Sequence, residues 1–158
     1  MKEPITSTKV SMMIRKPVTK VFEAFIDPAI TTKFWFTRSS GKLKEGEKLI
    51  WGWDMYNVEA PVLVRKITPN RTIEIEWGEG QDHSLVTWGF DAITEKDTYV
   101  TITNAELKGQ GDKLIHLLID TTGGFTMVLA GLKAWLEHGI QLHLVGDKFP
   151  KELRDRQS

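Results

Sequence analysis

The sequence predicts an α+β domain in which a curved antiparallel sheet wraps around a long C-terminal helix. Three observations favour this class. Five runs between residues 48 and 106 alternate apolar and polar side chains with the period of two that is typical of strands. Residues 122–138 instead repeat their apolar side chains at helical spacing. Between the first strand and this series of strands, the chain has room for two short helices.

The N-terminal elements come first. Residues 6–14 alternate as a strand does, and Pro17 follows at a position that suits the first turn of a helix, where its missing N–H costs nothing. This helix is expected to end at Asp27 because the residue before a proline is pushed out of the α region. A second short turn then carries three aromatic residues, 34–36.

The middle of the chain reads as a meander of strands. Turn residues such as glycine, proline and asparagine separate the runs, so consecutive strands should pair antiparallel. The predicted strands are residues 48–53, 58–67, 72–77, 84–92 and 99–106.

The alternation within these strands shows which side chains share a face. Trp51 shares its face with apolar neighbours, and the same holds for Trp77 and Trp88. These faces should look towards the C-terminal helix, which makes the concave side of the sheet aromatic. Asn104 has the same parity as the apolar residues of its strand and should also point inward.

The C-terminal helix is predicted to span residues 122–138, with Thr122 as N-cap and Gly139 as its end. Its apolar stripe consists of Phe125, Leu129, Leu132 and Leu136. Glycines 123, 124 and 131 weaken this helix, either to allow close approach or as ordinary packing. A shorter helix over 112–120 precedes it and is interpreted either as a lid or as an element docked permanently on the core.

Composition excludes several classes of function. The 158 residues suit one domain, which we assign to residues 1–146. Residues 147–158 are highly charged and are predicted to form a solvated tail. Basic and acidic residues both number 21, so nothing suggests binding to nucleic acid or to a membrane surface. Cysteine is absent, and no signal peptide or apolar run of roughly 18 residues is evident. We expect a cytoplasmic protein.

Motifs along almost the whole chain resemble one superfamily. They lie at residues 17–28, which read Pro-x-x-x-Val-Phe-x-Ala-Phe-x-Asp-Pro, at Trp35, and at 46–51, 67–77 and 123–139. They are similar to the START-like (helix-grip, SRPBCC) superfamily. Within it they resemble the group around the C-terminal domain of the heat-shock-protein ATPase activator, with polyketide-resistance and cyclase-like relatives. The resemblance implies a helix-grip fold, and it is weak for activity because this scaffold carries binders, carriers, cyclases and co-chaperone modules.

The aromatic face is either a core or the wall of a ligand cavity, which helix-grip domains often leave between sheet and helix. In the second case Asn104 would bond the ligand, although it could equally bond a neighbouring backbone group. The predicted ligand-binding residues are Trp35, Trp51, Trp77, Trp88, Asn104, Phe125, Leu129 and Leu132.

Signals for catalysis are poor. No histidine forms a known metal motif, and the spacing of His116 and Asp120 is more typical of a surface hydrogen bond. Asp54 and Glu59 could reach a cavity mouth, but two isolated carboxylates do not establish acid–base chemistry. We therefore predict no catalytic residues, no metal and no cofactor.

Three functional classes remain, in this order. The first is a non-catalytic module that binds a small apolar or aromatic molecule. The second is a cyclase-like enzyme acting on a polyketide-like substrate, for which Asn104 and Glu59 are the candidate polar groups. The third is a partner of a chaperone ATPase, although that co-chaperone has an additional N-terminal domain for which this chain is expected to have no room. Weak association of two copies is left open.

Overall fold

The computed structural model describes residues 3 and 5–156, and it shows one antiparallel sheet with helices on one side. The sheet order is β1-β7-β6-β5-β4-β3-β2, so the first strand pairs with the last. A register shift between Val64 and Lys66 marks a β-bulge, which increases twist and bends the strand. The strands are β1 (Thr8–Ile14), β2 (Arg38–Ser39), β3 (Lys48–Trp53), β4 (Val58–Thr68), β5 (Thr72–Trp77), β6 (Ser84–Ala92) and β7 (Thr98–Ala105).

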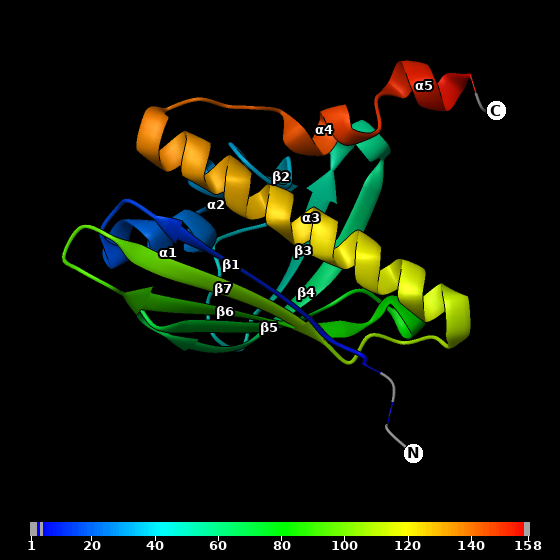
Figure 1. Cartoon of the computed structure of the whole chain (residues 1–158), viewed down its shortest axis with the longest axis horizontal. Coiled ribbons are helices and arrows are strands. Elements are labelled where there is room, and N and C mark those ends of the chain that lie inside the picture. Colours follow the sequence, from blue (N-terminus) through cyan, green and yellow to red (C-terminus); the bar gives the residue numbers. More distant parts are fainter. Residues whose placement is uncertain (1–2, 4, 157–158) are drawn as a thin grey trace.

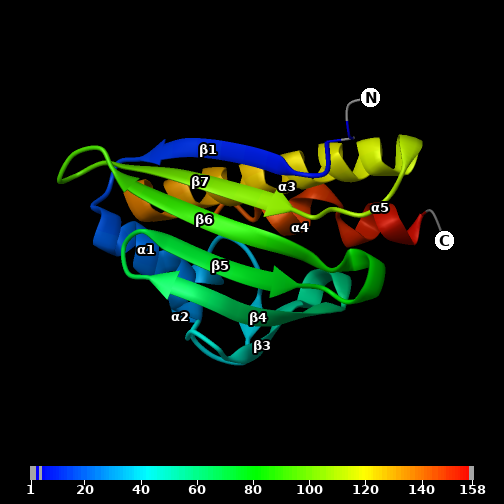
Figure 2. The ribbon, with the colours of Figure 1, turned by 90° about the horizontal axis from the view of Figure 1, so that it is seen from below.

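The helices lie against one face of this sheet and leave the other face uncovered, as the two views together show (Figures 1 and 2). α3 runs diagonally across the sheet, with α1 and α2 beside one end of it. This arrangement confirms the predicted fold class. The helices are α1 (Val18–Ile26), α2 (Pro28–Thr31), α3 (Gly111–His138), α4 (Leu144–Lys148) and α5 (Lys151–Asp155), and η1 (Asp54–Tyr56) and η2 (Gly80–Asp82) are 3₁₀ turns.

The C-terminal helix is longer than predicted, because α3 starts at Gly111 and absorbs the separate short helix expected over 112–120. Thr122 is not an N-cap: its hydroxyl donates to the Leu118 carbonyl one turn earlier, at 2.7 Å. A threonine hydroxyl bonded to the carbonyl four residues earlier is typical of a position within a helix, so no new helix begins at Thr122. The predicted end is confirmed, since Gly139 adopts a left-handed conformation with φ 65°.

A buried carboxylate fastens α3 to β1. The side chain of Glu137 is 8% exposed and accepts hydrogen bonds from the Arg15 backbone N–H at 2.9 Å and from Lys133 Nζ at 2.6 Å. Lys133 also donates to the Met13 carbonyl. Burial by itself would raise the pKa of Glu137, but the two hydrogen bonds, together with the nearby positive charge of Lys133, outweigh it and lower the pKa below its usual value.

Aromatic rings fill the space between the sheet and α3. Trp35, from the loop after α2, sits at the centre of this cluster. Its ring centroid lies 5.0 Å from that of Trp51 and 5.9 Å from those of Trp77, Trp88 and Phe125. Offset and edge-on rings at these distances are favourable, so the cluster is a packed core at this point.

The segment after α3 folds back over the domain and includes the short helices α4 and α5. It crosses above α3 towards the tip of the β3–β4 hairpin (Figure 1). Tyr56 donates a hydrogen bond to the Val145 carbonyl. The Arg154 guanidinium donates to the Met55 carbonyl at 2.7 Å and lies 4.9 Å from the Tyr56 ring. Residues 144–155 are thus attached to η1 at two places.

In composition, α3 is apolar enough to cross a membrane, with a mean hydropathy of 1.4 over its most apolar window. This corrects the expectation that no run in the chain reaches that level. A core helix can pass the same test, and Phe125, Leu129 and Leu132 of α3 are buried in the core. Only 28% of the window is buried, however, and the apolar side chains of Ile115 and Ile119 are 53% and 61% exposed.

Candidate functional site

The main candidate site is a cavity between β5, β7, η1, α3 and α4, here called the central cavity. Its volume is about 310 Å³, at the lower end of the range for small-molecule sites. Most of its wall is apolar or aromatic. The lining residues are Trp35, Tyr56, Trp77, Asn104, Asp120, Thr121, Gly124, Phe125, Met127, Val128, Val145 and Lys148.

Two further cavities adjoin the central one. The hairpin cavity, about 560 Å³, lies between the β3–β4 hairpin and the turn after β5, and it shares Tyr56, Trp77 and Val145 with the central cavity. The loop cavity, about 180 Å³, lies beside η2 and shares Trp77, Asn104 and Thr121 with it. Trp77 borders all three, so it stands at the point where they meet.

Half of the predicted site residues line the central cavity: Trp35, Trp77, Asn104 and Phe125. The other four lie in the core: Trp51, Trp88, Leu129 and Leu132. Strand parity could place them on the inner face, but only tertiary packing decides whether a neighbour covers them. Here the Trp35 ring lies against both Trp51 and Trp88. The indole N–H of Trp88 is buried with no acceptor among the residues that the structure describes.

Asn104 combines a structural role with a place at the cavity. Its Nδ2 donates to the Leu85 carbonyl and to Ser84 Oγ, both at 2.9 Å. The Trp77 indole N–H also donates to Ser84 Oγ, at 3.0 Å. Both hydrogen bonds donated by the amide nitrogen of Asn104 are therefore made within the protein. Its side-chain oxygen has no hydrogen-bond donor in the described part of the chain.

The glycines of α3 have two different roles. A β-carbon at position 131 would lie 3.1 Å from the Phe34 carbonyl oxygen, so Gly131 lets the loop after α2 pack tightly on the helix. A β-carbon at position 124 would meet nothing within 4 Å beyond its own stretch of helix, and Gly124 lines the central cavity. At Gly123 it would meet only Lys148 Nζ, at an ordinary 3.8 Å. Gly124 therefore leaves space open, whereas Gly131 closes it.

The two carboxylates expected near a cavity mouth are held by one arginine. Arg38 Nε lies 2.8 Å from Asp54 Oδ1, and its NH2 group lies 2.9 Å from Glu59 Oε1. The hydrogen bond from Arg38, helped by one from Thr37, lowers the pKa of Asp54. Glu59 lines the hairpin cavity, but its partner is this exposed guanidinium. Neither group is arranged as a general acid.

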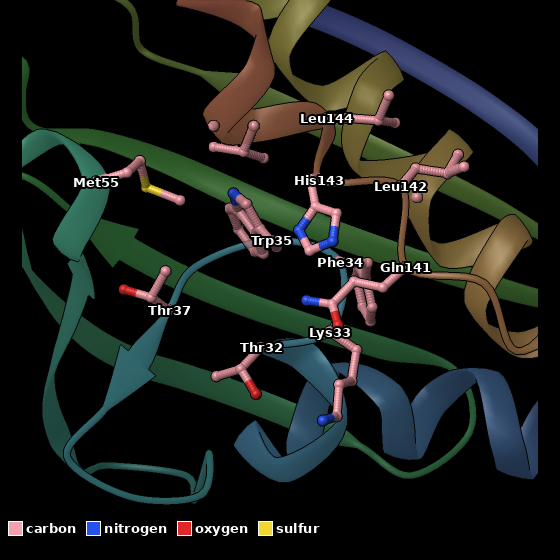
Figure 3. A pocket seen from close by; sticks show the side chains of 13 residues that line it. Thr32, Lys33, Phe34, Trp35, Thr37, Met55, Gln141, Leu142, His143 and Leu144 are labelled. Atoms are coloured by element: carbon pink, nitrogen blue, oxygen red, sulfur yellow. The ribbon is translucent and has the colours of Figure 1, made fainter. Parts of the chain in front are cut away.

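A fourth cavity lies on the other side of Trp35, between the loop after α2 and residues 141–146 (Figure 3). Gln141 and His143 reach into it from the returning segment, opposite Thr32 and Thr37. Its volume is about 120 Å³, too small for a drug-sized ligand. Among residues 3 and 5–156, no three histidine or acidic side chains group as metal ligands, and no hydrogen bond joins His116 to Asp120.

Fold and cavity together define the class: a helix-grip domain with a partly open space between its sheet and its long helix. A family model described as activator of Hsp90 ATPase homolog 1-like protein matches residues 15–137, and the chain belongs to this family. No curated protein matches the chain.

Solved structures agree on the fold. Protein SSP2350 from Staphylococcus saprophyticus is 27% identical with a TM-score of 0.73, over 86% of this chain and 95% of that one. The Aha1 dimer from Colwellia psychrerythraea is 18% identical, with a TM-score of 0.72 over 85% and 98%. PFC0360w, an HSP90 activator from Plasmodium falciparum, is 17% identical, with a TM-score of 0.60 over 90% and 95%.

Several cavity residues were missed at the sequence level. Ser84 had a usable signal, because it begins a predicted strand and shares the parity of Val86 and Trp88. Tyr56 and Val145 had none. They lie in short segments without periodicity, and they reach the cavity only because the C-terminal segment folds back onto η1.

Proposed function

We propose that this protein binds a small, largely apolar or aromatic molecule in the central cavity. The observation that carries the proposal is the cavity itself: about 310 Å³ bordered by Trp35, Trp77 and Phe125, with a buried amide at its wall. Flat rings bind well against such indole and phenyl walls. A binding role without catalysis is supported because Asp54 and Glu59, the two carboxylates expected near a cavity mouth, are both held by Arg38.

The returning C-terminal segment supports this reading because it forms a roof. Val145 and Lys148 of α4 line the central cavity, and Tyr56 holds the backbone of Val145. A roof made of a short helix can open without disturbing the sheet, since short terminal elements are among the least stable parts of a fold. A ligand would enter there.

The indole N–H signals of the six tryptophans provide a direct test. Titration of ¹⁵N-labelled protein with 2-naphthol should shift the signal of Trp77, identified with a Trp77→Phe variant. Trp135 is the internal control: it lies near the other end of α3, beside Lys33, and lines none of the cavities described above. Equal shifts at both positions, or no shift at high micromolar ligand, would contradict the proposal.

The family description and the exposed side chains Ile115 and Ile119 of α3 favour a second candidate, a module that docks on a chaperone ATPase. A partner would cover these apolar side chains. Hsp90 ATPase activity should then rise on adding the protein, and an Ile115→Lys/Ile119→Lys double variant should lose this effect. An unchanged ATPase rate with the wild-type protein would exclude the candidate.

A further inference from the structure

Two polar groups where the central and loop cavities meet have hydrogen-bonding capacity that the protein does not use. Ser84 Oγ receives hydrogen bonds from the Trp77 indole and from Asn104 Nδ2, at 3.0 and 2.9 Å. Both partners can only donate, so the Ser84 oxygen accepts twice and its own hydrogen remains to be donated. Among residues 3 and 5–156, the hydrogen bonds at Ser84 Oγ are these two, and it accepts both.

The second group is the side-chain oxygen of Asn104. The Leu85 carbonyl is an acceptor, so it requires the amide nitrogen on its side and turns Oδ1 the other way. Asn104 is 2% exposed and lines both the central and the loop cavity, and Ser84 is 3% exposed and lines the loop cavity. Polar side chains that line a largely buried cavity normally have partners, from the protein, from water or from a ligand.

We infer that the ligand carries, on its apolar body, one group that both donates and accepts a hydrogen bond, such as a phenolic hydroxyl or a secondary amide. Its hydrogen is donated to Asn104 Oδ1, and its oxygen accepts from the Ser84 hydroxyl. A carboxylate is disfavoured because its oxygens would face the lone pairs of Oδ1. The inference rests on the proposed function and adds the chemical class of the ligand's polar group.

Three ligands that share one ring system separate the two ideas. Isothermal titration of the wild-type protein compares 2-naphthol with 2-methoxynaphthalene, which only accepts, and with 2-methylnaphthalene, which does neither. We expect 2-naphthol to bind about tenfold tighter than 2-methylnaphthalene, as two net hydrogen bonds imply, and about threefold tighter than 2-methoxynaphthalene, which keeps the bond from Ser84. Similar affinities for all three would overturn the inference while leaving the cavity as a binding site. Failure of all three to bind would overturn both.

Protein variants then locate the anchor. Asn104→Leu keeps a similar volume but removes Oδ1, and we expect the preference for 2-naphthol over 2-methylnaphthalene to fall from about tenfold to about threefold, because only the bond from Ser84 remains. Thr126→Val is the matched control, since Thr126 is also on α3 but lines neither cavity. It should keep the full preference. Full preference in Asn104→Leu, or its loss in Thr126→Val, would overturn the assignment. Should Asn104→Leu fail to fold, the wild-type ligand series decides.

Discussion

Replacing Gly124 with leucine should fill the central cavity and stabilise the protein at the same time. The position is helical, and a β-carbon there would meet nothing within 4 Å beyond its own stretch of helix, so a larger side chain enters open space. Leucine in place of glycine gains about 0.8–1 kcal/mol in helix propensity. Partial burial of the new side chain adds to this, up to about 1.5–3 kcal/mol for full burial. We therefore expect unfolding to cost about 1–3 kcal/mol more.

Binding should change in the opposite direction. A leucine side chain would occupy space otherwise open to a ligand, and affinity for 2-naphthol should fall at least tenfold, roughly 1.4 kcal/mol. Urea unfolding measures the stability and calorimetric titration the affinity. The combination of higher stability and weaker binding separates a blocked cavity from a damaged fold.

Gly123→Ala is the matched control. It makes a similar gain in helix propensity, and its β-carbon would lie 3.8 Å from Lys148 Nζ, an ordinary contact. Gly123 does not line the central cavity, so this variant should be more stable than wild type and bind equally well. The reasoning is refuted if Gly124→Leu binds 2-naphthol as tightly as the wild-type protein does.

Three further changes test the roof, the packing of α3 and its attachment. Tyr56→Phe removes the hydrogen bond to Val145, so the free energy of unfolding measured in urea should fall by about 0.5–1.5 kcal/mol. The variant should also release the ligand faster in stopped-flow measurements, and an unchanged dissociation rate would argue against a roof. Gly131→Ala forces a β-carbon to 3.1 Å from the Phe34 carbonyl oxygen, so it should destabilise by about 1–3 kcal/mol despite the gain in helix propensity, whereas a stabilised variant would show that the loop yields. The pKa of Glu137 is lower in the folded than in the unfolded protein, so the unfolded state takes up the proton first as the pH falls. The stability that this carboxylate contributes is therefore complete above its unfolded-state pKa and is lost as the pH drops through its folded-state pKa. The stability difference between wild type and Glu137→Gln should therefore be largest near pH 7 and shrink below about pH 4.5, in unfolding curves across that range.

The sequence was sufficient for the fold because each element carries its own local pattern. Strand parity placed Trp77 on the inner face, and helical spacing placed Phe125 opposite it, so their meeting at the cavity followed from the fold class. The break before residue 122 was predicted wrongly because threonine is common both at N-caps and within helices. Only the acceptor that its hydroxyl finds, here the Leu118 carbonyl, decides between the two.

The distinction between core and cavity lay beyond local patterns. Leu129 and Phe125 belong to one stripe of α3, yet only Phe125 reaches the cavity, because the ring of Trp35 and the returning segment set the boundary from elsewhere in the chain. That segment follows residue 137, where the match to the family ends. The floor of the cavity is thus built from the part of the chain shared with the family, and Val145 and Lys148 in its roof lie outside that match.

The two glycines of α3 show why residue type alone could not distinguish a core position from a cavity position. Gly124 and Gly131 stand two turns apart on one helix and cost it similar amounts of helix propensity. At Gly131 the missing side chain brings the Phe34 backbone against the helix, and the gap is closed by packing. At Gly124 no group approaches, and the gap becomes part of the central cavity. The neighbour from a distant part of the sequence, rather than the glycine, determines whether the position stabilises the core or keeps a site open.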